Sequence, residues 1–516
     1  MPHRALVVRA PYPSAESGSV PVPHPHAHTS EDPDLVTAAG SPPEASEPPP
    51  APTEIDGRLL RTAFVLVLGT FMATLDATIV NVGIDTLAQE FRASVTEIQW
   101  VTTAYLLALL LAVPSSGWIV DRFGGRRTWI SAVVLFLAGS LLCALAWSVE
   151  SLVVFRVIQG LGGGLLPPVG QALVAREAGP KRIGRIISIV GVIPLLSPVI
   201  GPIVGGTILG VAGWPWLFYV NLPIGLVAVL LALRFVAPHP PAAQGAPFDV
   251  LGAALLPPGV AALVFGLTEV GNGRSLDFVP VLLGLVGGVV LLMAYAVHAV
   301  RMRGVPLIDL RLFTRPPFGA AASALIILGA SVYGAVFLLP LYFQAGRGLT
   351  PFAAGLLLVP QGLGAALGSV VVNRTIDKVA PRTLVLTGIG LIALGTVLFT
   401  QLGSAPSDPL IIASLLVRGI GLGMIGAPVM NIVYSSMPHA QLPRASGALN
   451  LLNVLGGSIG TAVLAVVLQT RLEARAHRGE PGVALAFADT FWWTLAFCLV
   501  AVIGATRLPR RSAATE

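Results

Sequence analysis

Asp76 is the residue whose surroundings in the sequence most clearly suggest chemistry. It lies inside the largely apolar segment 62–88, roughly one helical turn from Thr78 and Asn81. An ionised side chain at mid-membrane costs ~2.5–3.5 kcal/mol on insertion scales, so acids at that depth usually face a cavity or a partner. Because desolvation favours a neutral carboxyl group, Asp76 could take up and release a proton. An ion-paired structural aspartate is the alternative.

Two arginines occupy similar settings in distant apolar segments. Arg156 begins the run Arg-Val-Ile-Gln-Gly, which contains Gln159, and Arg418 begins the run Arg-Gly-Ile-Gly. Arg156 could clamp neighbouring helices or hold a carboxylate or carbonyl group, and the sequence leaves both open. We therefore group four residues with Asp76 as candidates for the cavity or for coupling: Asn81, Arg156, Gln159 and Arg418.

A short charged hairpin joins the apolar segments 97–120 and 128–147. It is too short to cross a membrane, and its positive charge predicts a cytoplasmic position. A weaker copy at 373–382 contains Asp377 and Arg382. A motif repeated across two halves suggests a duplicated, two-bundle transporter. The residues of interest in the first hairpin are Gly117, Asp121, Arg122, Gly124, Arg126 and Arg127.

The fifth apolar segment carries a pattern of glycine and proline, Gly201-Pro202-Ile-Val-Gly205-Gly206. Proline removes a backbone donor and kinks a helix. The three glycines form a smooth face that lets another helix approach closely. Ordinary tight packing would explain the same pattern.

The composition indicates that these segments lie in lipid. Of 516 residues, 54% are hydrophobic and 11% are charged, whereas soluble proteins carry about 25% charged residues. The net charge of +6 is spread over short loops, and no basic block is long enough to track a nucleic-acid backbone. The two cysteines, Cys143 and Cys498, lie inside apolar segments and are expected to serve packing. Neither a disulfide framework nor a zinc site is available.

Fourteen apolar segments are long enough to span a hydrocarbon core, which predicts an all-α membrane protein. Basic residues concentrate in alternate loops, and this asymmetry predicts that both termini are cytoplasmic. The matching motifs divide twelve segments into two pseudo-symmetric six-helix bundles, with two further helices inserted between them. The fourteen segments are 62–88, 97–120, 128–147, 151–174, 186–211, 216–236, 249–270, 279–300, 318–343, 352–373, 383–402, 409–436, 445–470 and 487–507.

These segments give a domain plan. Residues 1–57 are rich in Pro, Ala, Ser, Glu and His and are expected to form a disordered cytoplasmic tail. The N-terminal bundle would cover 58–236, and the linker with the two inserted helices 237–316. The C-terminal bundle would cover 317–507, followed by a tail at 508–516.

With these residues assembled, the chain resembles the major facilitator superfamily, and more narrowly its fourteen-span drug:proton antiporter branch. The resemblance covers about residues 62–507. The hairpin 117–127 matches the family's loop signature in full, and 201–206 matches the signature of exporters. The segment 214–225 resembles a Trp-Arg-Trp…Asn-x-Pro element, although Pro215 replaces the arginine.

The resemblance implies a proton-coupled antiporter that exports amphipathic or lipophilic small molecules, such as drugs, by alternating access. Asp76 would carry the proton, and the hairpin residues would form an inner gate in which Asp121 faces a helix N-terminus of the second half. The three arginines of the hairpin would add ion pairs and contact anionic lipid headgroups. The preference for Arg over Lys and the abundant Ala, Gly and Pro indicate a GC-rich genome, and hence the cytoplasmic (inner) membrane of a bacterium.

Other functions remain open at this point. An exporter dedicated to one metabolite, lipid, siderophore or self-made antibiotic fits the same residues. A polytopic membrane enzyme is a distant alternative, because only His298 falls within an apolar segment and no acid is expected to pair with it. The sequence contains no phosphate-binding Gly-x-x-x-x-Gly-Lys-Ser/Thr motif. We therefore expect no ATP, no cofactor, no metal and no nucleic acid among its partners.

Overall fold

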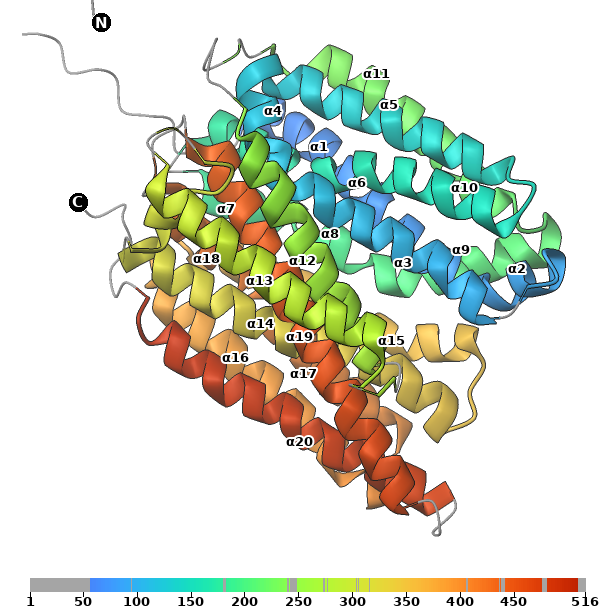
Figure 1. Ribbon diagram of the computed structural model, residues 1–516. Coiled ribbons are helices and arrows are strands. Elements are labelled where there is room, and N and C mark those ends of the chain that lie inside the picture. Colours follow the sequence, from blue (N-terminus) through green and yellow to red (C-terminus); the bar gives the residue numbers. More distant parts are fainter. Residues whose placement is uncertain are drawn as a thin grey trace, which may run out of the picture. The chain divides into compact units, whose positions relative to one another are not determined.

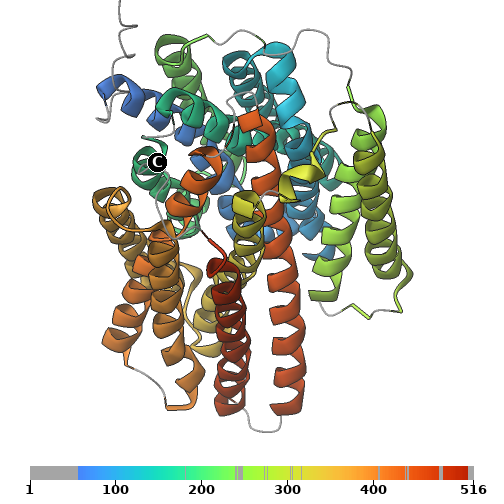
Figure 2. The ribbon, with the colours of Figure 1, turned by 90° about the vertical axis from the view of Figure 1, so that its left-hand side faces the viewer.

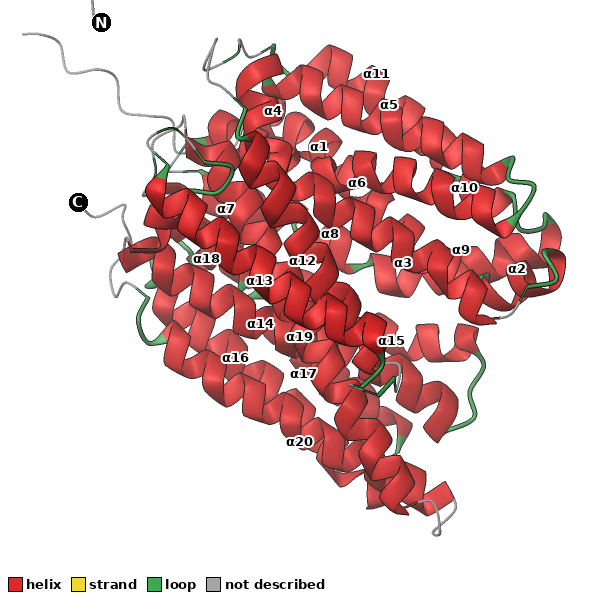
Figure 3. Cartoon of the chain, viewed as in Figure 1, coloured by secondary structure: helices red, strands yellow, loops and turns green. Residues whose placement is uncertain are grey.

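The computed structural model describes residues 56–508. Within this range it leaves out 94, 180–181, 239–240, 242–247, 272–273, 276, 303, 305, 315, 405–406, 436, 438–440 and 476–479. The predicted tails at 1–57 and 508–516 therefore lie almost wholly outside the described residues. The described part is helical and contains no strand (Figure 3).

The first half of the described chain contains eleven α-helices (Figure 1). They are α1 (Gly57–Val82), α2 (Ile84–Glu90), α3 (Val95–Ala112), α4 (Ser116–Phe123), α5 (Gly125–Ala144), α6 (Val149–Ala178), α7 (Ile183–Val190), α8 (Val192–Leu195), α9 (Ser197–Val211), α10 (Trp216–Tyr219) and α11 (Asn221–Phe235). The short 3-10 helix η1 (Val113–Ser115) joins α3 to α4.

The remaining helices follow in two groups. Two long helices come first, α12 (Val250–Gly271) and α13 (Val279–Arg301). The second half consists of α14 (Pro316–Leu341), α15 (Pro351–Thr375), α16 (Pro381–Val397), α17 (Asp408–Gly423), α18 (Gly426–Ser435), α19 (Leu442–Arg475) and α20 (Glu480–Ala505). Short helical segments η2 (Leu310–Thr314), η3 (Tyr342–Gly346) and η4 (Leu398–Ser404) lie between them.

Thirteen segments of the described residues are helical, long and apolar enough to cross a membrane. The predicted fifth span, 186–211, is the exception, because the structure divides it into α7, α8 and α9. The breaks fall at Gly191 and Leu196, on either side of Pro194, and proline cannot donate the hydrogen bond that a continuous helix requires. With this broken span the count is near fourteen. The chain is thus a multi-pass, all-α membrane protein, as the sequence predicts.

Helix starts follow local sequence signals. The side chain of Asp56 caps α1 by accepting a hydrogen bond of 2.7 Å from the backbone N–H of Leu59. A reciprocal pair of hydrogen bonds between Ser148 and Ser151 opens α6. Gly124 separates α4 from α5 with a φ of 84°, a backbone conformation that glycine adopts without strain. The charged hairpin therefore turns at Gly124, and the preceding residues of the motif belong to a helix.

Each half packs mainly against itself. Helix α6 contacts α1, α3 and α5 in the first half, and α17 contacts α15 and α16 in the second. The inserted helices α12 and α13 pack against each other, and α12 also contacts α3 and α19. Figure 2 shows this pair in yellow-green beside the other helices. The inserted pair thus contacts both halves, mainly through α3 and α19.

Candidate functional site: a buried carboxylate–arginine network

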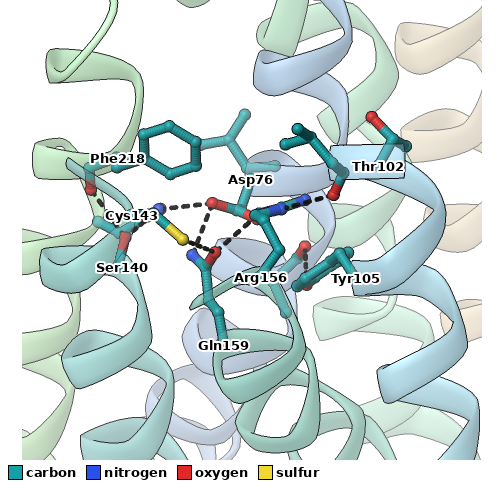
Figure 4. A network of polar contacts seen from close by, with 12 residues as sticks. Asp76, Thr102, Tyr105, Ser140, Cys143, Arg156, Gln159 and Phe218 are labelled. Carbon is teal, nitrogen blue, oxygen red and sulfur yellow. Dashed lines mark hydrogen bonds and ion pairs between the residues drawn. The ribbon is translucent and has the colours of Figure 1, made fainter. Parts of the chain in front are cut away.

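Asp76 lies on α1 and is completely buried. Its Oδ2 accepts a hydrogen bond of 2.5 Å from Arg156 of α6. Its Oδ1 accepts from the side-chain amides of Gln159, at 2.9 Å, and Asn221, at 2.8 Å. The carboxylate is therefore held by three donors from two helices other than its own (Figure 4). Arg156 holds a carboxylate here and at the same time joins α6 to α1, so the contacts of both roles left open by the sequence are present.

Arg156 is also completely buried and makes contacts beyond Asp76. Its Nε donates to the backbone carbonyl of Val101 on α3 at 3.1 Å, and its Nη1 donates to Gln159 at 2.7 Å. Its guanidinium lies 4.0 Å from the ring centre of Tyr105 and 5.8 Å from that of Phe218, within the range of cation–π attraction. Its Nη2 has no hydrogen-bond partner.

A second set of polar side chains surrounds this pair. Asn221 donates to the hydroxyl of Ser140, which donates in turn to the carbonyl of Phe218. Cys143 lies 3.6 Å from Gln159, and the hydroxyl of Tyr105 donates to the backbone of α1. The network therefore draws on α1, α3, α5, α6 and the region of α10 and α11.

Two glycines let the helices approach closely enough to form this network. A Cβ added at Gly139 of α5 would lie 2.5 Å from the Cα of Gln159. A Cβ added at Gly160 of α6 would lie 2.5 Å from the backbone carbonyl of Tyr105. Since real Cβ atoms do not come so near backbone atoms, side chains at these positions would separate α6 from α5 and α3.

The energetics of the pair depend on both partners being present. Two buried charges lose hydration, and their mutual attraction offsets that loss only with good geometry and further hydrogen bonds. Removing one charge leaves the other uncompensated in an apolar bundle, which is strongly unfavourable. A proton that neutralised Asp76 would thus deprive Arg156 of its counter-ion and change the balance of forces among α1, α3 and α6.

Asn81, predicted to act with Asp76, lies apart from this network. It is exposed, and its side chain accepts a hydrogen bond of 3.0 Å from Thr102 on α3. Asn221 was missed as a site residue although it belongs to the Asn-x-Pro element at 214–225. Tyr105 and Ser140 gave no signal in the sequence, because a single Tyr or Ser in an apolar segment is common.

The fifth-span glycines lie against the helix that carries Asp76. Gly201 of α9 abuts Thr78, and a Cβ at Gly205 would lie 3.3 Å from the carbonyl of Ile79. Thr78 donates to the carbonyl of Ser197 at 3.2 Å, and Thr74 shares a 2.8 Å hydrogen bond with the Ser197 hydroxyl. Gly206 has open space around it, so the close approach depends on Gly201 and Gly205 alone. Pro202 lies within α9.

The two charged hairpins join the halves through ion pairs. Asp121 of α4 lies 2.7 Å from Arg444 near the start of α19, and both side chains are largely buried. Gly117, one turn before Asp121, packs directly against Arg444. Asp377, just after α15, forms an ion pair with Arg185 of α7. We call the end of the bundles that carries these hairpins the hairpin end.

In the first hairpin, Arg126 makes a hydrogen bond to the backbone rather than the predicted ion pair. Arg126 donates to the backbone carbonyl of Leu233 at the end of α11, at 2.6 Å. Arg122 and Arg127 are exposed, and none of the three forms an ion pair with a described residue. Arg382 is half-buried at the start of α16.

A polar cluster near the hairpin end also bridges the halves. The side-chain oxygen of Gln171 on α6 accepts from Asn450 of α19 at 2.9 Å and from Tyr434 of α18 at 3.3 Å. Ser446 of α19 donates to the carbonyl of Pro168 at 2.9 Å. The sequence gave no indication of these contacts, because they depend on how the halves meet.

The fourth span of the second half repeats the arginine without the acid. Arg418 of α17 is 3% exposed and donates to Gln361 of α15 at 2.7 Å. Its Nε has no partner, and no described acid lies within ion-pair distance. Arg418 therefore lies in a different bundle from Asp76 and does not join its network.

One expectation about the inserted helices is wrong. His298 on α13 was expected to have no acidic partner, but its Nε2 lies 2.7 Å from Asp249, which immediately precedes α12. The sequence hid this pair because the two residues lie at opposite ends of the α12–α13 hairpin in the chain. Among the described residues no three His, Cys, Asp or Glu side chains come together as a group that could hold a metal ion.

Comparison with known proteins places this geometry in context. Residues 66–461 match the model of the family described as the Major Facilitator Superfamily. The chain is 39% identical over 436 residues to the "Multidrug resistance protein B homolog" of Mycobacterium tuberculosis, an alignment that covers 84% of this chain and 80% of the relative. It is 32% identical over 412 residues to the "Multidrug export protein EmrB" of Haemophilus influenzae, covering 79% and 80%.

Solved structures share the fold at low sequence identity. The proton:xylose symporter XylE bound to 6-bromo-6-deoxy-D-glucose superposes with a TM-score of 0.58 and 16% identity. The match covers 86% of this chain and 96% of that structure. This likeness concerns the arrangement of helices alone.

Proposed function

The chain belongs to the major facilitator superfamily, and on this premise we propose that it is a proton-coupled antiporter that exports amphipathic or lipophilic small molecules. The names of its relatives, a multidrug resistance protein homolog and a multidrug export protein, support export of drug-like compounds. The bundles offer mostly apolar surface with few polar groups, which suits such cargo. The protein would lie in the cytoplasmic membrane with both termini and the hairpin end in the cytoplasm.

The observation that carries the proposal is the buried Asp76–Arg156 pair. An ionisable group inside a membrane bundle marks an ion or proton pathway by default. Asp76 is the acid of that pair. Because its carboxylate is completely buried, a proton can reach it only when the bundle admits water from one side. Uptake of a proton would release Arg156 from its counter-ion and weaken the contacts that hold α1 to α6.

A change at α1 has a physical route to the second half. Thr74 and Thr78 on α1 bond Ser197 at the start of α9, and Gly201 keeps the two helices close. Helix α9 in turn packs against α15 of the second half. Movement of α1 that follows protonation would therefore shift α9 and the interface with α15.

The hairpin end would serve as the inner gate. The ion pairs Asp121–Arg444 and Asp377–Arg185, together with the Gln171 cluster, join the halves there. At the opposite end, the ion pairs Arg347–Asp408 and Arg475–Asp489 each lie within the second half. This arrangement suits a state that is closed to the cytoplasm, and opening inward would require the inter-half pairs to break.

The proton gradient supplies enough energy for this cycle. A membrane potential of 100 mV contributes ~2.3 kcal/mol for each charge moved. A pH difference of one unit contributes ~1.4 kcal/mol more. One proton would thus sustain a gradient of an uncharged substrate of roughly several hundredfold, and two protons a gradient on the order of 10⁵-fold.

Everted membrane vesicles test the proposal directly. An imposed proton gradient should drive accumulation of rhodamine 123, a fluorescent lipophilic cation, and the dye should cause proton release. Replacing Asp76 by Asn should reduce gradient-driven uptake to background, whereas replacing the exposed Asp277 by Asn should not. Undiminished gradient-driven uptake by the Asp76→Asn protein would remove Asp76 from the coupling role.

A further inference from the structure

The second half holds a buried cation for which the described residues offer no counter-ion. Arg418 lies ten residues into α17, about 15 Å along the helix from its first residue, which places it near the middle of the span. It is 3% exposed and touches no described acid. Arg156, in the equivalent helix of the first half, has Asp76 at 2.5 Å. The two halves thus repeat the buried arginine, but among the described residues only the arginine of the first half has an acidic partner.

The hydrogen-bond donors around Arg418 are also incompletely used. Gln361 accepts one hydrogen bond from Nη1, while Nε has no acceptor at all. Outside the immediate contacts of Arg418, the hydroxyl of the fully buried Thr494 on α20 also has no partner. One turn further along α20, Cys498 lies within electrostatic range of Arg418 and contacts Ser331 of α14 at 3.3 Å. Unpartnered donors at this depth are unfavourable unless an acceptor arrives during the cycle.

We propose that Arg418 is a recognition site for a carboxylate carried by the exported molecule. A guanidinium binds a carboxylate through two parallel N–H donors, and in a low-dielectric setting this geometry is strong. The unpartnered Nε supplies one of those donors, and Nη2, which lies on the same edge of the guanidinium, supplies the other, while Gln361 stays on Nη1. The inference rests on the proposed function, since it requires cargo to pass between the halves.

Gln361 is the side chain that orients Arg418 for the cargo. It is half-buried on α15, the helix of the second half that packs against α7, α8 and α9 of the first. The next residue, Gly362, faces Leu196 of the first half, where a Cβ would approach to 2.9 Å. The hydrogen bond from Arg418 to Gln361 therefore links the guanidinium to the helix that packs against the first half. A cargo carboxylate on Nε and Nη2 would add a charged acceptor and leave the hydrogen bond to Gln361 in place.

Equilibrium binding of two matched dyes to the purified protein in lipid nanodiscs tests the inference. Rhodamine 110 carries a free carboxylate, and rhodamine 123 is the same dye with that carboxylate masked as a methyl ester. Wild-type protein should bind rhodamine 110 at least tenfold more tightly than rhodamine 123, measured by fluorescence polarisation. Arg418→Gln should abolish this preference by weakening rhodamine 110 binding, and rhodamine 123 binding should change less than twofold.

A second variant guards against a folding defect in the first. Cys498→Asp places a carboxylate near Arg418 and leaves the arginine intact, so it should also abolish the preference by filling the site from within. Both variants should elute as monodisperse protein from a sizing column. A wild-type protein that binds both dyes equally, or neither, overturns the inference, as does a preference that survives in both variants.

Two further comparisons separate the possible causes. The titrations are repeated in chloride and in methanesulfonate, an anion without a carboxylate, at equal ionic strength. A preference that appears only in methanesulfonate would assign the site to free chloride and overturn the assignment to cargo. Because binding is measured without a gradient, failure of this inference is independent of vesicle transport. Gradient-driven rhodamine 123 uptake that depends on Asp76 would leave the proposed function intact even if the dye preference is absent.

Discussion

Asp121 of α4 and Arg444 of α19 form an ion pair of 2.7 Å that joins the two halves of the chain. The second hairpin makes the reciprocal contact, because Asp377 pairs with Arg185 of α7. In each case the hairpin acid of one half binds an arginine at the start of the fifth span of the other. Each ion pair therefore joins one half to the other. Such pairs would break when the two halves rock apart, so they are suited to form a gate.

Breaking this pair should open the hairpin end. In Arg444→Gln, Asp121 keeps its largely buried position but loses its cation, which is strongly unfavourable. We expect a cysteine introduced at Ser446, which is buried near the interface of the halves, to react several-fold faster with a polar maleimide than in the wild-type background. The native cysteines Cys143 and Cys498 are buried and should stay unreactive.

The charge-reversal pair provides the control for that gate. Exchanging the two residues in Asp121→Arg with Arg444→Asp should restore slow labelling and part of the transport, whereas each single reversal should not. Equal labelling rates in wild-type protein and Arg444→Gln would show that the ion pair does not hold the gate closed.

Asn221 should be required for coupling although it was missed in the sequence. Its amide is one of the three donors to Asp76 and also holds Ser140. Asn221→Ala removes a hydrogen bond to a charged group, a loss of about 1.5–3 kcal/mol, so gradient-driven uptake should fall by roughly tenfold or more. The matched control is Asn81→Ala, at an exposed position outside the network, which should retain most of the transport. A larger defect in Asn81→Ala than in Asn221→Ala would contradict the assignment.

The sequence predicts the helical class, the number of spans and the residues at the centre of the network. Asp76 and Arg156 stand out because ionised groups are costly in apolar segments, and this cost acts wherever the segment lies. Their pairing was not predictable, since 80 positions separate them and only the packed bundle brings them together. The breaks at Gly191 and Leu196 escaped notice because an apolar run with prolines can be either a kinked or a divided helix.

For the contacts between the halves, the sequence predicts the type of contact but not the residues that make it. The resemblance suggested that Asp121 meets the start of a helix in the second half, and Arg444 lies at the start of α19. Nothing in the sequence marked Arg444, Arg185 or Gln171 as partners. Single polar residues at loop ends are common, and their roles arise from the relative placement of two bundles that fold from distant parts of the chain.

Gly139 should be among the positions least tolerant of a methyl group. A Cβ there would lie 2.5 Å from the Cα of Gln159, so Gly139→Ala must push α5 away from α6 and disturb Asp76. Such overpacking typically costs about 1–3 kcal/mol, and we expect a clearly lower melting temperature in detergent together with reduced transport. Gly390→Ala on α16 is the control, because no atom lies within 4 Å of the added Cβ. The prediction fails if the two variants melt at the same temperature.

The contact between Asp249 and His298 should hold the inserted helices to the gate. Asp249 is 4% exposed and accepts hydrogen bonds from His298, at 2.7 Å, and from the backbone of Gly252, at 2.8 Å. Its neighbour Phe248 packs against Trp118 of α4, with the two ring centres 4.5 Å apart. Trp118 lies three residues before Asp121 in the chain. The start of the inserted pair is thus tied to the helix that carries the gating acid.

Asp249→Ala should therefore loosen the attachment of α12 to α4. It leaves the backbone N–H of Gly252 and the ring of His298 without their acceptor, a loss of about 1–3 kcal/mol for buried donors. We expect faster proteolysis of the linker between α11 and α12, measured in nanodiscs, and a rise in thiol labelling at position 446 when cysteine is placed there. Asp277→Ala, at an exposed site near the other end of the inserted pair, should change neither reading. If Asp249→Ala leaves proteolysis and thiol labelling at wild-type levels, the Asp249–His298 contact does not connect the inserted helices to the gate. The contact between Trp118 and Phe248 would then be the next one to test for this connection.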